Sequence, residues 1–78
     1  DEVDFILLKD RRPIPIEVKS QAGEFEIPKG LKRFLTRYPK TKTAYVINST
    51  QACVSTWGTC QIKWMTFDVF ALSAALDF

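Results

Sequence analysis

Residues 1–20 read DEVDFILLKDRRPIPIEVKS, and this stretch decides the fold of the chain. Residues 3–8 are rich in strand-forming side chains, and residues 9–12 are polar and typical of a turn. Residues 13–18 alternate between apolar and other side chains with a period of two, as a half-buried strand does. The stretch therefore predicts a β-hairpin.

The register of this hairpin follows from the length of its turn. A four-residue turn at 9–12 pairs Leu8 with Pro13 and puts six apolar side chains on one face, which is predicted to face the core. These side chains are Val3, Phe5, Leu7, Ile14, Ile16 and Val18. A shift of one residue would scatter them, so the apolar pattern supports this register. Because Pro13 and Pro15 donate no ladder hydrogen bond, the second strand should begin at a sheet edge or beside a bulge.

The other face of the hairpin carries charged side chains. The same register places Asp4 opposite Glu17, with Cβ atoms about 4.5–5.5 Å apart. Lys19 projects from the same face as Glu17, because residues two apart on a strand share a face. Two carboxylates at this distance can share one Mg²⁺ or Mn²⁺ ion, with the lysine positioning a water or stabilising charge on phosphorus. The alternative is a solvated surface on which Lys19 pairs with Glu2 or Glu17.

The middle of the chain predicts a loop, a helix and a strand. Residues 20–26 are expected to form the loop, and the helix is expected to begin at Pro28 and to end before Pro39. An apolar stripe at helical spacing should face the core. Its members are Ile27, Leu31, Phe34, Leu35 and Tyr38. Residues 43–48, TAYVIN, then predict a short buried strand.

The last part of the chain predicts a second hairpin and a closing helix. The hairpin flanks Trp57 and Gly58, and Thr66 is the expected N-cap of the helix at 67–76. That helix is apolar nearly all round, so it should pack against something on more than one side. The predicted order is β-β-α-β-β-β-α, an α/β fold with a mixed sheet and a crossover connection.

Charge is distributed unevenly along the chain. The net charge is +2, yet seven of the nine acidic residues lie in residues 1–28, and residues 29–67 contain seven Lys or Arg and no acid. On the predicted helix, Lys32, Arg33 and Arg37 are candidates for contacts with a phosphate backbone. The alternative is a solvated helix face. Trp57 would either stack on a nucleic-acid base or contact a neighbouring domain.

The cysteines and the hydropathy pattern exclude several classes of protein. Cys53 and Cys60 have a spacing that matches no zinc motif, and the chain contains no His to complete one. No apolar run approaches the roughly 20 residues of a membrane span, and no signal peptide is visible. We therefore expect reduced cysteines that pack in the core, a cytoplasmic location and no association with membranes.

The segments EVDFIL at 2–7 and PIPIEVKS at 13–20 resemble the core of the PD-(D/E)xK nuclease superfamily, in which an acid on one strand precedes an acid-x-Lys triplet on the next. More narrowly, these segments and KGLKRFLTRYPKTKTAYVIN at 29–48 resemble the nuclease-like C-terminal domain attached to many prokaryotic AAA-type ATPases. Val3 stands where the superfamily has its name-giving proline. The resemblance implies a restriction-endonuclease-like core, and residues 1–78 would form one such domain, cut from a longer chain and missing its N-terminal helix.

The resemblance also implies roles for individual residues. Asp4 and Glu17 would be metal ligands together with the backbone carbonyl of Val18, and Lys19 would be the catalytic lysine. Gln21, just past the triplet, is a candidate contact to water or phosphate. The expected function is Mg²⁺- or Mn²⁺-dependent hydrolysis of DNA phosphodiester bonds, with an ATPase domain in the same or a partner chain. The alternatives are a catalytically inactive DNA-binding or assembly module of an ATPase, and a small resolvase-like nuclease that works as a homodimer.

Overall fold

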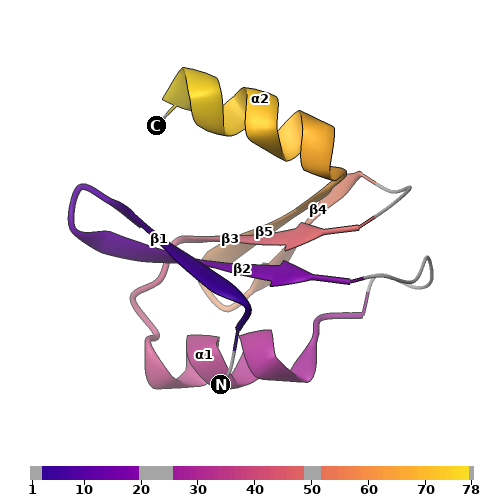
Figure 1. The fold of residues 1–78 in the computed structure, drawn as a ribbon. Helices are drawn as coiled ribbons and strands as arrows, with labels where there is room; N and C mark the ends of the chain where they lie inside the picture. The colour runs from indigo at the N-terminus through magenta and orange to yellow at the C-terminus, as the bar shows by residue number, and fades with distance from the viewer. Residues whose placement is uncertain (1–2, 20–25, 49–51, 78) are drawn as a thin grey trace.

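The computed structural model describes residues 3–19, 26–48 and 52–77 of the 78-residue chain. The elements in chain order are β1 (Phe5–Lys9), β2 (Arg12–Val18), α1 (Lys29–Arg37), β3 (Thr43–Ile47), β4 (Cys53–Trp57), β5 (Cys60–Met65) and α2 (Phe67–Asp77). The predicted order β-β-α-β-β-β-α is confirmed. The described strands form one mixed sheet, with α1 on one face and α2 on the other (Figure 1).

The sheet has the strand order β1-β2-β3-β5-β4. The pairs β2–β3 and β3–β5 are parallel, and the two edge strands β1 and β4 pair antiparallel with their neighbours. The expectation that β2 begins at a sheet edge is confirmed for its first residues: β2 lies between β1 and β3, but its ladder with β3 begins only at Ile16. Pro13 and Pro15 precede this ladder, so their missing N–H groups cost the sheet no β2–β3 hydrogen bond.

The β1–β2 hairpin has the predicted register and a shorter turn. Phe5 pairs with Ile16 and Leu8 with Pro13, as predicted. The turn contains two residues instead of four, because Lys9 also pairs with Arg12. The turn residues at 10 and 11 both have left-handed backbone angles, with φ of 53° and 65°. This combination is typical of the two-residue turn whose twist matches that of the flanking strands.

Each face of the sheet carries its own apolar cluster. On the α1 face, helix residues pack against strand residues from β3 and β5. The buried members are Leu31, Phe34, Leu35, Ala44, Val46, Cys60, Ile62 and Trp64. On the α2 face, Phe70 packs against a cluster of four buried side chains. They are Ile14, Ile16, Tyr45 and Ile47. The predicted burial of the strand at 43–48 is confirmed.

The predicted apolar stripe of α1 is confirmed except at its last member. Leu31, Phe34 and Leu35 are buried, whereas Tyr38 follows the end of the helix and is exposed. Its ring packs on that of Phe34, with 4.7 Å between the ring centroids. The stripe stops there because the chain turns at Pro39 toward β3.

Two other expectations of burial are wrong. Phe5 is 61% exposed, and Val18 is also exposed, because β1 is an edge strand and the α2-face cluster extends only to Leu7 on that strand. Within the described residues, α2 packs on one side only, through Phe70, and Leu76 on α2 is 78% exposed. Thr66 directly precedes α2 as expected, and its carbonyl accepts the N–H of Phe70 at 3.0 Å.

The second hairpin closes through Gly58 and Thr59, because Trp57 pairs with Cys60. Gly58 has a φ of +60°, which glycine adopts without the steric cost that other residues meet. Cys53 lies opposite Trp64, so the two cysteines do not face each other, and both are free thiols. Across residues 3–19, 26–48 and 52–77, no helix has the length and hydropathy that crossing a membrane requires.

Candidate functional site

The structure brings Asp4 and Glu17 together on the α1 face of the sheet. Asp4 directly precedes β1, and its Oδ2 accepts the backbone N–H of Val18 at 2.8 Å. Glu17 follows Ile16, which belongs to the α2-face cluster, so Glu17 projects to the α1 face. The two carboxyl groups are hydrogen bonded to each other. We call Asp4 and Glu17 the acid pair.

The acid pair is a coupled electrostatic system. Burial, the hydrogen bond with Asp4 and the negative charge of Asp4 together raise the pKa of Glu17 to about 7, with burial as the largest cause. The pKa of Asp4 is lowered by its hydrogen bonds from the Glu17 carboxyl and from the Val18 N–H. Glu17 therefore keeps its proton up to about neutral pH and donates it to the ionised carboxylate of Asp4.

The donor chemistry of the acid pair fits a hard divalent cation. When the shared proton leaves, two adjacent negative charges remain, and a dication between them would relieve their repulsion. Mg²⁺ is typically held by one or two carboxylates, with waters and substrate phosphate oxygens completing its shell. No group of three or more His, Cys, Asp or Glu side chains that could hold a metal ion comes together among the described residues.

Lys19 lies just beyond the end of β2. Its backbone N–H donates to the carbonyl of Ile47 at 2.8 Å, which extends the β2–β3 ladder by one residue. The structure thus places Lys19 two residues along the chain from Glu17, directly after the end of β2.

The predicted phosphate-binding residues lie on the same face of the sheet as the acid pair, because α1 covers that face (Figure 1). Arg33 and Arg37 are exposed on α1, and the guanidinium of Arg37 lies 6.0 Å from the centroid of the Tyr38 ring. Lys32 is half-buried, with its Nζ 5.6 Å from the centroid of the Trp57 ring. Gln21 lies outside the described residues.

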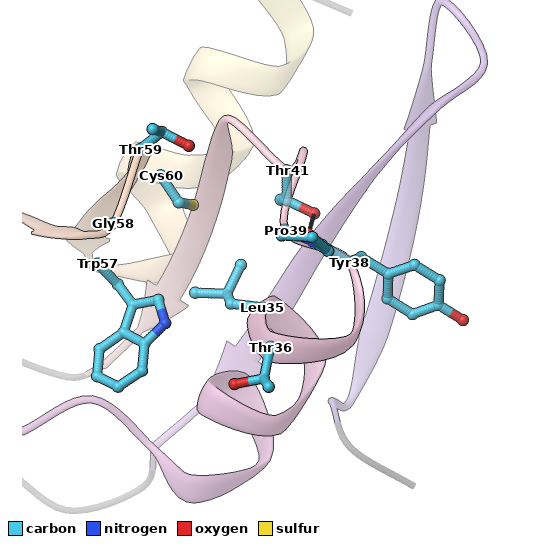
Figure 2. Close-up of a pocket in the computed structure, with 9 residues that line it drawn as sticks. All are labelled: Leu35, Thr36, Tyr38, Pro39, Thr41, Trp57, Gly58, Thr59 and Cys60. Carbon is cyan, nitrogen blue, oxygen red and sulfur yellow. Dashed lines mark hydrogen bonds between the residues drawn. The ribbon is translucent and has the colours of Figure 1, made fainter.

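A second concave feature lies where the C-terminal end of α1 meets the β4–β5 hairpin (Figure 2). It is a cavity of about 250 Å³, which we call the hairpin pocket. Its lining residues are Leu35, Thr36, Tyr38, Pro39, Thr41, Trp57, Gly58, Thr59 and Cys60. Sequence reasoning identified Trp57 but not the pocket, because the pocket forms only when two segments far apart in sequence pack together.

The fold and the acid pair define a small mixed α/β domain with paired carboxylates on its sheet. Residues 1–67 match the model of DUF4143, a domain of unknown function, and the chain belongs to this family. No curated protein and no solved structure matches the chain. The family membership gives no function, and the chemistry rests on the site itself.

We expect Glu17→Gln to make the folded domain more stable at alkaline pH. In the wild type, the pKa of Glu17 lies at about 7 in the fold. Its stabilising proton is fully present below the ordinary glutamate pKa and is lost as the pH rises through 7. Glutamine keeps an N–H donor for Asp4 and carries no charge. The variant should gain about 1 kcal/mol at about pH 8.5, a figure reduced for the partial exposure of the site.

Urea denaturation in the presence of a chelator measures this effect from about pH 5 to about pH 9. Glu26→Gln is the matched control, because Glu26 is exposed and lies outside the acid pair. Asp4 has the opposite effect on the pH dependence of stability. Because the pKa of Asp4 is lowered in the fold, its ionised form stabilises the protein, and this stability is lost only at acidic pH. Equal pH dependence in the wild type and in Glu17→Gln would contradict the coupling between the two acids.

Proposed function

We propose that this chain is a Mg²⁺-dependent, nuclease-like domain of the PD-(D/E)xK type that hydrolyses DNA phosphodiester bonds. The observation that carries the proposal is the acid pair: Asp4, directly before β1, accepts the N–H of Val18 on β2, and Asp4 and Glu17 shift each other's pKa. The strand order and the E-V-K triplet at 17–19 support it through the resemblance to the restriction-endonuclease-like core. An ATPase domain in the same or a partner chain belongs to the same proposal.

Asp4 and Glu17 would hold the metal ion, with the carbonyl of Val18 as a third ligand. Lys19 donates to β3, so the peptide groups of Val18 face the other way, toward β1 and Asp4, as the bond from the Val18 N–H shows. Bound Mg²⁺ supplies Lewis-acid stabilisation of the charge on the phosphodiester. Glu17 must give up its proton before it can serve as a ligand.

Lys19 is the proposed catalytic lysine. Its backbone is fixed by the hydrogen bond to Ile47, while its ammonium sits on a flexible four-carbon stem. In the proposal, this ammonium reaches the scissile phosphate once DNA is bound and orients the attacking water or stabilises the developing negative charge. Arg33 and Arg37 would hold the DNA backbone through contacts that do not depend on base sequence.

The test combines metal binding with DNA cleavage by the wild-type chain. Calorimetric titration with Mn²⁺ should show one saturable site, and supercoiled plasmid should be nicked with Mg²⁺ or Mn²⁺ but not with a chelator present. Linear duplex, single-stranded and branched DNA are assayed in parallel, since the preferred form is not fixed by the site. A chain that binds no metal and cuts none of these DNA forms would overturn the proposal.

The second candidate function is a non-catalytic DNA-binding or assembly module of an ATPase. The specific observation in its favour is that Arg33 and Arg37 are exposed on α1, where they can contact a DNA backbone without a metal ion. Such a module would bind DNA equally well with and without metal and would cut none. The titration and the cleavage assay above therefore separate the two candidates.

A further inference from the structure

The hairpin pocket is distinct from the acid pair in its place on the fold. It is lined by the end of α1 and by the turn between β4 and β5, which lies beside the amino end of β3. The acid pair lies toward the carboxyl end of β2. The two sites share the α1 face and are separated along α1, whose nine residues span about 14 Å.

The pocket combines an aromatic wall with hydrogen-bond acceptors. The Trp57 side chain lies on one side, and Leu35 and Thr36 of α1 lie on the other (Figure 2). The indole is 38% exposed, so its ring is available to a ligand. The Thr36 and Thr41 hydroxyls donate to the backbone carbonyls of Lys32 and Tyr38, so their remaining lone pairs can accept hydrogen bonds from a bound group.

The pocket residues come from a part of the sequence in which every charged side chain is Lys or Arg. No Asp or Glu occurs between Glu26 and Asp68, and every pocket residue belongs to this acid-free stretch. The ammonium of Lys32 lies 5.6 Å from the centroid of the Trp57 ring. A flat group on the indole would therefore lie close to a cation that can bind a phosphate attached to it.

We propose that the hairpin pocket binds one unpaired base of single-stranded DNA. The base stacks on Trp57, an N–H group on its edge donates to a free lone pair of Thr36, and its phosphate contacts Lys32. A paired base has these edges occupied by its partner, so the pocket favours single strands over duplex. The inference rests on the proposed function in one respect, since it names the form of DNA that this nuclease-like domain would hold.

The geometry of α1 connects the pocket to the acid pair. A strand anchored at Trp57 can follow the exposed side of the helix, past Arg37 and Arg33, toward Asp4 and Glu17. The nine residues of the helix span about 14 Å, a length that an extended single strand covers in a few nucleotides. The pocket would therefore set the distance from an unpaired base to the bond that is cut.

Intrinsic fluorescence of the wild-type chain tests the proposal without cleavage. The chain is titrated in a chelator with oligothymidylate of about ten nucleotides, within the range of known single-strand site sizes, and with duplex of equal length. Trp57 is the exposed indole and Trp64 is buried, so quenching by the oligonucleotide reports on Trp57. We expect saturable quenching by the single strand and binding at least about tenfold weaker to the duplex.

Variants localise the binding to the pocket. Trp57→Ala should weaken binding of a labelled single strand by about tenfold or more, and Trp57→Phe should retain most of it because phenylalanine also stacks. Thr59→Glu keeps Trp57 and adds a carboxylate in the exposed turn, so it should weaken binding where Thr59→Gln does not. Arg12→Ala is the control for loss of a cation, because Arg12 lies in the β1–β2 hairpin, outside the pocket.

Wild-type affinity in both Trp57→Ala and Thr59→Glu would overturn the inference, as would equal affinity for duplex and single strand. Burial of Trp57 that depends on protein concentration without DNA would also overturn it, since the occupant would then be a second copy. Cleavage of duplex DNA without single-strand binding would contradict the base-binding pocket and support the proposed nuclease function. Single-strand binding without any metal-dependent cleavage would support the base-binding pocket and contradict the proposed nuclease function.

Discussion

Asp4→Asn and Glu17→Gln are each expected to abolish metal-dependent DNA cleavage and saturable Mn²⁺ binding together. Each substitution removes a negative charge and a carboxylate oxygen from the acid pair, which supplies both side-chain ligands in the proposed metal site. Loss of a mere supporting partner of a metal ligand already costs about 10–100-fold in affinity or activity. Removal of a ligand should therefore reduce cleavage by more than about a hundredfold.

A variant of Lys19 distinguishes metal binding from DNA cleavage in the same experiment. Lys19→Met keeps the length of the side chain and removes the ammonium, so Mn²⁺ binding should persist while cleavage is lost. Glu26→Gln is the matched control and should retain both. Undiminished Mn²⁺ binding by Glu17→Gln, in a variant shown to be folded by its urea transition, would exclude the acid pair as the metal site.

Leu31→Ala is expected to remove most of the stability of the fold. Leu31 is fully buried between α1 and the sheet, at the centre of the α1-face cluster. Leucine-to-alanine changes at such sites cost about 2.7–5 kcal/mol, because the lost transfer free energy adds to that of the cavity left behind. A domain of this size has a free energy of unfolding on the order of 5 kcal/mol, so little would remain.

Leu76→Ala is the matched control for this prediction. The same atoms are removed from the exposed outer side of α2, where the change should stay within about 0.5 kcal/mol. Urea denaturation followed by circular dichroism measures both variants. A loss of less than about 1 kcal/mol in Leu31→Ala would mean that the α1 face is not the main core. A large loss in Leu76→Ala would mean that α2 is packed on its outer side after all.

The local pattern of the first hairpin was enough to predict its register and hence the meeting of Asp4 and Glu17. Strict alternation in β2 leaves one pairing that keeps the apolar side chains together. The turn was harder to predict, because Asp10 and Arg11 adopt left-handed angles without the glycine that usually signals them. The register is nevertheless predicted correctly, since Leu8 pairs with Pro13 whether the turn has two residues or four.

Features that depend on packing between distant segments were not predictable. Phe5 and Tyr38 fit apolar patterns, yet each lies where no second layer covers it. The hairpin pocket needs the end of α1 and the β4–β5 turn to approach each other, and nothing in either segment encodes that approach. The position of the Lys19 ammonium depends likewise on where the chain leaves β2, which strand periodicity does not describe.

The short turn at residues 10 and 11 has a consequence for comparing members of this family. Asp4 and Glu17 meet because the twelve residues between them, 5–16, form a hairpin with only two residues in its turn. One residue inserted within either strand would turn the first acid to the other face of the hairpin, although both acids and the E-x-K triplet would remain in the sequence. Members of the family with such an insertion would therefore keep the motif in sequence without bringing the two acids together, so strand length has to be compared along with the acids.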